Sequence, residues 1–125
     1  MSFPAPWTVW IHRYDSTARN AHNNPVRAYV PAKDEPGEPI QAIQWDYVEN
    51  EPDVDKVVDR VTLFLPRVVK SPDGVIVDVP KATDLVDLEA GGAVRQYEIV
   101  GIRDYNFGFH GWQPGYVLDL QRATP

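Results

Sequence analysis

Short runs of alternating apolar and polar residues, each ended by proline or glycine, recur along this chain and limit the folds that it can adopt. In residues 7–14, WTVWIHRY, the side chains of Trp7, Val9 and Ile11 form one apolar face, and GYVLDLQR at residues 115–122 repeats the pattern. A period of two predicts β-strands with one buried face. Because 12 prolines and 8 glycines in 125 residues leave little room for long helices, the chain is predicted to be all-β.

Turn signals connect further strands. The sequence SPDG at residues 71–74 has proline and glycine where a type I turn favours them, which predicts a hairpin between VTLFLPRVV and VIVDV. Gly91 and Gly92 mark a turn between two more strand-like runs, and Gly101 inside the second run predicts a bulge. We expect about six or seven strands that form one small single-domain β-barrel with long loops over residues 1–125.

Two segments are predicted to be long loops. Residues 15–39 are rich in turn formers and are expected to hold only one short strand, at 26–30. Residues 40–47, IQAIQWDY, are strand-like, and the acidic segment at about 46–59 is predicted to be a loop that leads into RVTLFLP. A short helix over residues 54–61 is an alternative, because the valines there fall at helical spacing.

Charge and composition exclude several classes of protein. With 18 acidic and 12 basic residues, the formal net charge is -6 and the pI is about 4.9, so tight binding to nucleic acid is disfavoured. The absence of cysteine excludes disulfide bonds and thiolate metal sites. The histidines lack metal-ligand spacing. We therefore predict no metal site and scattered surface positions for all of them: His12, His22 and His110.

No pattern for catalysis stands out in the sequence. None of the serines lies in a GxSxG motif, and the P-loop and the dinucleotide-binding fingerprint are absent. Pairs of carboxylates such as Asp84 and Asp87 occur, as chance alone would produce in a chain with 18 acidic residues. We predict that the protein is not an enzyme and that it has no catalytic residues and no cofactor.

No stretch of the sequence has the apolar length of a signal-peptide core or of a transmembrane helix. On this pattern we expect a soluble protein that remains in the compartment where it is made.

The aromatic segment DYNFGFHGWQPGY, residues 104–116, is predicted to connect the last two strands. Its glycines permit the turn, and its aromatic side chains would leave a sizeable apolar patch uncovered. Stacking on nucleic-acid bases is disfavoured because acidic residues offset the few arginines nearby. We predict that Phe107, Phe109 and Trp112 contact another subunit. The alternative is a soluble ligand-binding β domain with these stacking candidates: Trp10, Trp45, Trp112 and Tyr116.

The motifs follow one another in a recognisable order. TVWIHRY precedes GEPIQAIQW and an acidic segment, and RVTLFLP, ATDLVDL, QYEIVGIRDY and GYVLDLQRA come after them. This order, from Trp7 to Ala123, resembles the head-to-tail stopper proteins, also called head-completion or head-closure proteins, of long-tailed non-contractile phages. ATDLV and YEIVG look like the family's A-T-D-x-V and Y-E-V-x-G steps, which implies that Asp84, Tyr97 and Gly101 are barrel positions. VVKSPDGVIVDVPK and AGGAVR are longer than the family pattern, so the number of strands there stays open.

The resemblance implies a small β-barrel that stacks as a homo-oligomeric ring beneath the portal and adaptor proteins of a virion. Such a structural protein of the head-tail connector is made in the cytoplasm of the bacterial host. It closes the DNA-filled capsid and docks the tail proteins, with no membrane involved and with DNA only as passing cargo. Alone, the chain would be monomeric, with long loops that a partner orders.

The family's channel loop corresponds to the acidic segment. Carboxylates that face the channel would repel the DNA backbone and let it slide during ejection. The resemblance implies this position for the following residues: Glu49, Asn50, Glu51, Asp53 and Asp55. A tail-terminator or minor tail protein is the alternative among assembly proteins, and a long amphipathic helix would favour a terminator.

Overall fold

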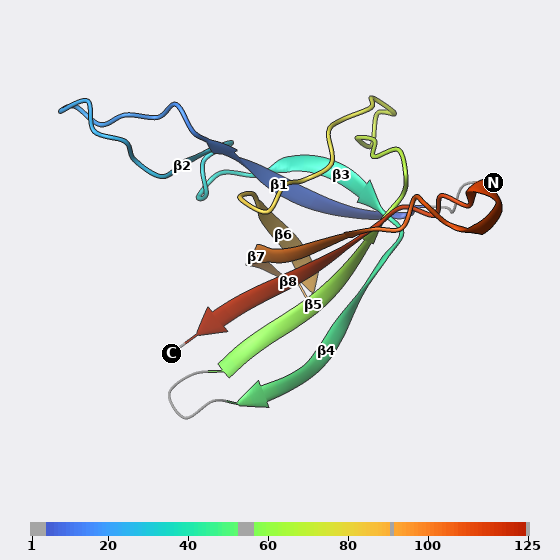
Figure 1. The fold of residues 1–125 in the computed structure, drawn as a ribbon. Helices are drawn as coiled ribbons and strands as arrows, with labels where there is room; N and C mark the ends of the chain where they lie inside the picture. The colour runs from blue at the N-terminus through green and yellow to red at the C-terminus, as the bar shows by residue number, and fades with distance from the viewer. Residues whose placement is uncertain (1–4, 53–56, 91, 125) are drawn as a thin grey trace.

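The computed structural model describes residues 5–52, 57–90 and 92–124, and these residues form one antiparallel sheet (Figure 1). The all-β class is confirmed, with eight strands in place of about six or seven. The single short helix in the described residues is the 3-10 turn η1, Phe109–Gly111. The strands are β1 Trp7–Asp15, β2 Ala28–Val30, β3 Glu38–Ala42, β4 Gln44–Pro52, β5 Val57–Leu65, β6 Leu85–Ala90, β7 Ala93–Asp104 and β8 Tyr116–Thr124.

The sheet is strongly curved, but it is not closed into the predicted barrel. Its strand order is β2-β1-β6-β7-β8-β5-β4, and β3 pairs with β1 beside β2. Strand β3 continues into β4 through the single residue Ile43. The chain thus connects the two ends of the sheet at this corner, but no strand pairing closes them into a barrel. The backbone nitrogen of Ile43 donates to the carbonyl oxygen of Phe64 at 2.9 Å, which ties the corner to β5.

The core lies inside the curve of the sheet and follows the predicted alternation. In β1, Val9 and Ile11 are buried, whereas Trp7 at the start of the strand is 58% exposed. Inward-facing side chains come from β1, β3 and β5 to β8 and from the segment after β5. The core residues are Val9, Ile11, Ile40, Ala42, Val61, Leu63, Leu65, Val69, Val86, Leu88, Tyr97, Ile99, Leu118 and Leu120.

The turn predictions have different outcomes. The SPDG turn forms, with the Gly74 nitrogen donating to the Ser71 carbonyl oxygen at 2.9 Å, but only one isolated bridge follows it in place of a two-stranded hairpin. The hairpin of β6 and β7 is confirmed, and Gly92 in its turn has a φ of 82°. The bulge near Gly101 is also confirmed, because the register of β7 against β8 shifts between Ile99 and Gly101.

The two predicted loops also differ in outcome. Residues 15–39 contain the expected short strand, β2, and residues 16–27 extend from the sheet as an arm (Figure 1). The acidic segment is not the loop that was predicted, because residues 46–52 belong to β4 and residues 57–59 to β5, and these strands pair. The alternative of a helix is wrong for its described part, which is strand.

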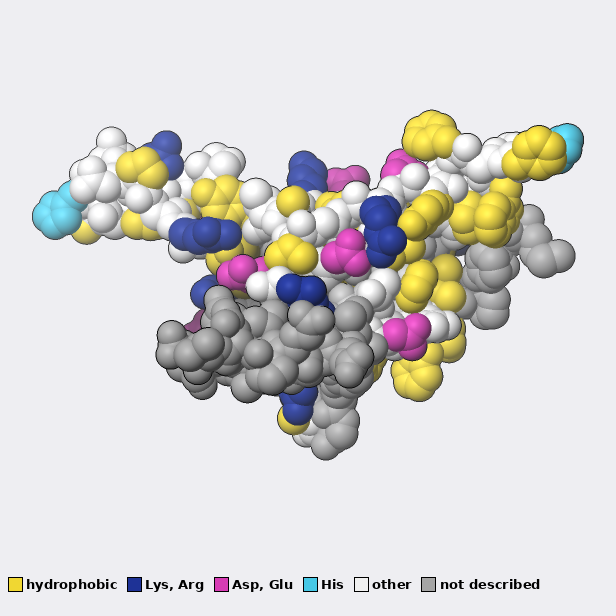
Figure 2. All heavy atoms as spheres, turned by 60° about the horizontal axis from the view of Figure 1, so that its bottom comes forward, with side chains coloured by type: hydrophobic (Ala, Val, Ile, Leu, Met, Phe, Trp, Pro, Cys, Tyr) yellow, Lys and Arg dark blue, Asp and Glu magenta, His cyan; other side chains and the backbone are white. Residues whose placement is uncertain are grey.

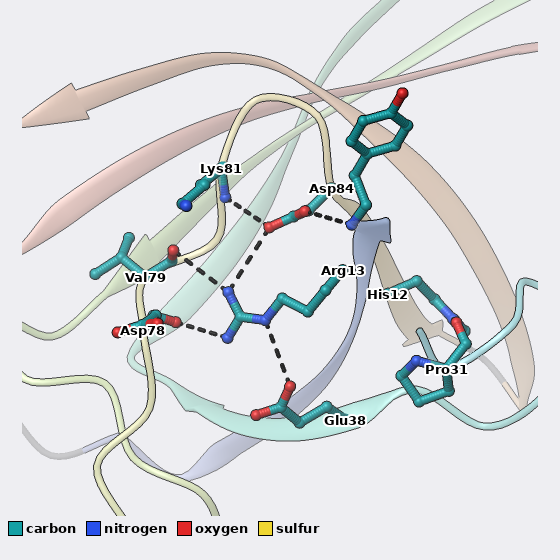
Figure 3. A network of polar contacts seen from close by, with 9 residues as sticks. His12, Arg13, Pro31, Glu38, Asp78, Val79, Lys81 and Asp84 are labelled. Carbon is teal, nitrogen blue, oxygen red and sulfur yellow. Dashed lines mark hydrogen bonds and ion pairs between the residues drawn. The ribbon is translucent and has the colours of Figure 1, made fainter. Parts of the chain in front are cut away.

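Asp84 joins the start of β6 to β1 through a buried polar network (Figure 3). One carboxylate oxygen accepts a hydrogen bond from the backbone nitrogen of Tyr14 at 2.8 Å, and the other accepts one from the nitrogen of Lys81 at 2.8 Å. Arg13 lies 3.7 Å from the same carboxylate. Its guanidinium also donates to the carbonyl oxygens of Asp78 and Val79. The network therefore fastens the irregular segment before β6 to the end of β1.

Asp84→Ala should destabilise the fold by about 2–4 kcal/mol, because it leaves two backbone N–H groups without their acceptor in a buried site. The free energy of unfolding in urea measures the loss. Asp78→Ala is the matched control, since Arg13 uses only the backbone carbonyl of that residue, and we expect it to change stability by less than about 0.5 kcal/mol. Equal losses for the two variants would contradict this role of Asp84.

His12 is fully buried, so its predicted surface position is wrong. Its Nδ1 lies 2.9 Å from the carbonyl oxygen of Pro31, and its Nε2 lies 2.7 Å from Oδ2 of Asp87. A backbone carbonyl oxygen and an ionised carboxylate both accept hydrogen bonds, so this geometry favours an imidazole that is protonated on both nitrogens. Burial alone would lower the pKa of His12, but the hydrogen bonds to Asp87 and Pro31 and the charge of Asp87 raise it above its usual value.

The raised pKa makes stability depend on pH in a defined direction. The folded state holds the His12 proton more tightly than the unfolded state does, so the contribution is complete below the ordinary pKa of 6.5 and is lost as pH rises through the folded-state pKa. We expect the free energy of unfolding to fall as pH rises above about 6.5, and to fall less in a His12→Gln variant. Identical pH profiles for the two proteins would contradict the protonated pair.

Candidate functional site

The aromatic loop, residues 105–115 between β7 and β8, extends beyond the end of the sheet (Figure 1). Its base is closed by a hydrogen bond from the Tyr105 nitrogen to the Gly115 carbonyl oxygen at 3.1 Å. Nearer the tip, the Gly108 nitrogen donates to the Trp112 carbonyl oxygen at 2.9 Å. These bonds hold the two halves of the loop side by side, and the short helix η1 forms its tip.

The tip of this loop exposes three large aromatic side chains, which are those predicted to contact another subunit. Phe107 is 88% exposed, Phe109 is 84% exposed and Trp112 is 60% exposed. Hydrophobic side chains gather at this end of the molecule (Figure 2). Exposed apolar patches of this kind mark contact surfaces, since leaving them in water is unfavourable.

A groove of about 580 Å³ lies between the loop and the adjoining ends of β5 and β8. Most of its lining is apolar and comes from the β3–β4 corner, β5, the loop and β8. The apolar residues of the lining are Ile43, Phe64, Leu65, Tyr105, Trp112, Pro114, Tyr116 and Val117. The structure therefore brings together Trp112 and Tyr116 of the four predicted stacking residues, whereas Trp10 and Trp45 do not line the groove.

The positive charge at the groove is already neutralised. Arg103 donates a hydrogen bond to Asp119 at 3.0 Å, and a second one to the Tyr105 hydroxyl at 3.2 Å. The groove therefore suits an apolar group better than an anion.

The other predicted site residues lie apart from this loop. Glu49, Asn50 and Glu51 are in β4, while Asp53 and Asp55 lie outside the described residues. Of the three barrel positions, Asp84 belongs to the buried network, Tyr97 is a core residue of β7, and Gly101 lies at the bulge. A methyl group on Gly101 would come within 3.2 Å of the Asp119 carboxylate.

Sequence reasoning missed the pair of His12 and Asp87. These residues are 75 positions apart in the chain, and no local pattern could have joined them. His22 and His110 are exposed, as predicted. In the part of the chain that the structure describes, no three His, Cys, Asp or Glu side chains are close enough to hold a metal ion.

Comparisons with known proteins give no assignment, since no family model, no curated protein and no solved structure matches this chain. Among the described residues, no helix has the length and apolar character needed to cross a membrane.

Gly115 at the base of the aromatic loop cannot be replaced without strain. Its φ is 136°, and a Cβ atom there would overlap the carbonyl oxygen of Leu65. Gly115→Ala should therefore cost about 2–4 kcal/mol of stability and displace the loop. Gly74→Ala is the matched control, because Gly74 also has a positive φ but open space around it, and about 1 kcal/mol is expected. Thermal unfolding of both variants checks the difference, and a smaller loss for Gly115→Ala would contradict it.

Proposed function

We propose that this chain is a structural protein of a phage virion, a ring-forming head-to-tail stopper of the head-tail connector. It closes the DNA-filled capsid beneath the portal and adaptor proteins and docks the tail. The observation that carries the proposal is the aromatic loop, which holds Phe107, Phe109 and Trp112 in water beyond the sheet. In a ring these side chains are covered by a neighbouring protein, which removes their apolar surface from water.

The sheet and its projections support the same proposal. The motif order that resembles the stopper family spans the one curved sheet, and the arm and the aromatic loop extend from it on different sides (Figure 1). Projections of this kind can reach neighbouring subunits while the sheet stays intact. A tail terminator is less well supported, because the described residues contain no α-helix. A minor tail protein is the remaining alternative among assembly proteins.

The proposal includes the acidic residues of the paired strands β4 and β5. In the stopper family the corresponding segment faces the DNA channel, and carboxylates there would repel passing DNA. The function proposed here needs neither a cofactor nor a catalytic residue.

A ligand-binding β domain is the second candidate, and the groove favours it. Its volume of about 580 Å³ lies in the range of small-molecule sites. Because Arg103, the one cation among the described residues that line the groove, is already paired with Asp119, an apolar ligand would be the expected occupant.

Association with the portal and adaptor proteins of the same phage tests the proposed function. The wild-type chain should join a complex of those two proteins, as measured by light scattering after size-exclusion chromatography. Trp112→Ala, and separately Phe107→Ala with Phe109→Ala, should weaken this association about tenfold or more, because the exposed rings become interface contacts. Circular dichroism should show an unchanged fold for each variant.

A matched control removes exposed apolar groups elsewhere. Val75 and Ile76, which directly follow the SPDG turn, are 61% and 68% exposed, and Val75→Ala with Ile76→Ala should leave association unchanged. Failure of the wild-type chain to bind the portal and adaptor complex would remove the proposed function. Saturable binding of a small apolar ligand in the groove would then favour the second candidate.

A further inference from the structure

The aromatic loop carries an exposed apolar projection at its end and an apolar groove at its base. We call the side chains of Phe107 and Phe109 the aromatic tip. They are 88% and 84% exposed, and neither is among the described residues that line the groove. Trp112 forms part of one wall of the groove and is itself 60% exposed. One copy therefore has an apolar group to bury and an apolar space to fill, at two places on its surface.

The loop is held in a shape that keeps the aromatic tip away from its own groove. The backbone bonds from Tyr105 to Gly115 and from Gly108 to Trp112 join its two halves at the base and near the end. In addition, Arg67, which follows β5, donates from Nη1 to Oε1 of Gln113 at 2.8 Å. Because the second half of the loop is thus fastened beside β5, an occupant of the groove has to come from another molecule.

The lining of the groove suits an uncharged ring. Four of its side chains are aromatic, namely Phe64, Tyr105, Trp112 and Tyr116, and aromatic rings favour edge-to-face or offset contacts with one another. Its amide and its guanidinium are already hydrogen bonded. Gln44 donates to Asp46 at 2.6 Å, and Arg103 donates to Asp119 at 3.0 Å.

The aromatic tip has the matching chemistry. Residues 105–115 contain no lysine, arginine, aspartate or glutamate, so burying the tip removes no such charge from water. The Phe109 ring lies against the His110 ring, with 4.1 Å between their centres and 63° between their planes. This contact orients Phe109 at the end of the loop.

We propose that the aromatic tip of one copy binds in the apolar groove of a neighbouring copy. The contact covers Phe107 and Phe109 with the rings and aliphatic side chains that line the groove. Because the tip and the groove are different surfaces, each copy can receive one neighbour and enter another, as the subunits of a ring do. The inference rests on the proposed function only for the closure of these contacts into a ring.

The size of the contact favours assembly on a partner over a free dimer. A buried aromatic side chain covers about 150–250 Å², so two rings and the walls that they meet bury roughly 600–1,000 Å² in total. Stable complexes bury about 1,200–2,000 Å². Free copies should therefore associate weakly. Copies that the portal and adaptor proteins hold side by side should make the contact readily, because their effective concentration is high.

A second copy is favoured over a small molecule as the occupant. Sites for small molecules usually combine an apolar lining with a few polar groups that fix the ligand's orientation. In this groove Gln44 and Arg103 are already satisfied within the chain. The tip needs no such groups, because its own loop holds it in position, and its burial removes a patch that is otherwise exposed on every copy.

Cysteine cross-linking between two variants tests the contact directly, because the chain has no cysteine of its own. His110→Cys places a thiol beside the tip and keeps both phenylalanine rings, and Gln44→Cys places one at an exposed position of the groove. The two variants are mixed and treated with a short bismaleimide, on the portal and adaptor complex and also free at high concentration. We expect a mixed dimer in both settings, with the higher yield on the complex.

A matched control replaces the groove thiol with one elsewhere. Val94→Cys, at a side chain that is 64% exposed in the β6–β7 hairpin, should give at least tenfold less product with His110→Cys. Adding Phe107→Ala and Phe109→Ala to the His110→Cys variant should also lower the yield about tenfold or more. Sodium sulfate should maintain or raise the yield, because it strengthens apolar contacts. Circular dichroism should show an unchanged fold for every variant.

Three outcomes would overturn the inference. These are no cross-link from Gln44→Cys above the Val94→Cys control in either setting, a yield that does not depend on Phe107 and Phe109, and a yield that sodium sulfate abolishes. Saturable binding of the neutral fluorophore N-phenyl-1-naphthylamine in the groove, without a cross-link, would assign the groove to a small ligand instead.

The proposed function is judged separately. A variant with both His110→Cys and Gln44→Cys should give a ladder of products longer than a dimer on the complex. Cross-linking that depends on the aromatic tip but stops at the dimer, or that occurs although the chain does not join the portal and adaptor complex, would count against the proposed function alone. A chain that joins the complex without this cross-link would count against the inference alone.

Discussion

Strand β1 pairs with three other strands, and the arrangement of the sheet depends on its register. One of its edges pairs with β6, and the other pairs first with β3 and then with β2. In this register Val9 and Ile11 enter the core, while His12 on the opposite face meets Asp87. A shift by one residue would exchange the two faces. It would place a protonated histidine in the apolar interior and would leave Asp87 without its partner.

The buried polar contacts strengthen this choice of register. Asp84 accepts a hydrogen bond from the backbone of Tyr14, and His12 connects β1 both to β6 and to the segment after β2. Apolar residues favour any register that buries them, whereas a hydrogen-bonded pair is satisfied in only one. These contacts hold together segments that are far apart in the chain. They thereby fix the two ends of the arm, at the end of β1 and after β2. The inner face of the sheet is covered by the hydrophobic core. The functions that we propose therefore use the segments that extend from the sheet.

Two apolar surfaces lie at the same end of the sheet. The aromatic loop presents rings that gain from burial, and the groove at its base presents apolar walls that gain from an apolar occupant. In the proposed ring, the apolar contacts would contribute most of the affinity. Assembly could then be specific without any enzyme-like site.

The sequence alone determined the class of the fold, most of its strands, the β6–β7 hairpin, the bulge at Gly101 and the exposure of Phe107, Phe109 and Trp112. These features follow from alternation, turn residues and local composition, which act over a few neighbouring residues. Only the tertiary structure decided the open curvature, because the corner at Ile43 joins β3 to β4 end to end. It also decided the burial of His12 and the gathering of apolar side chains from separate segments around one groove. These features depend on contacts between residues far apart in the chain, and no local pattern records which distant partner a side chain will meet.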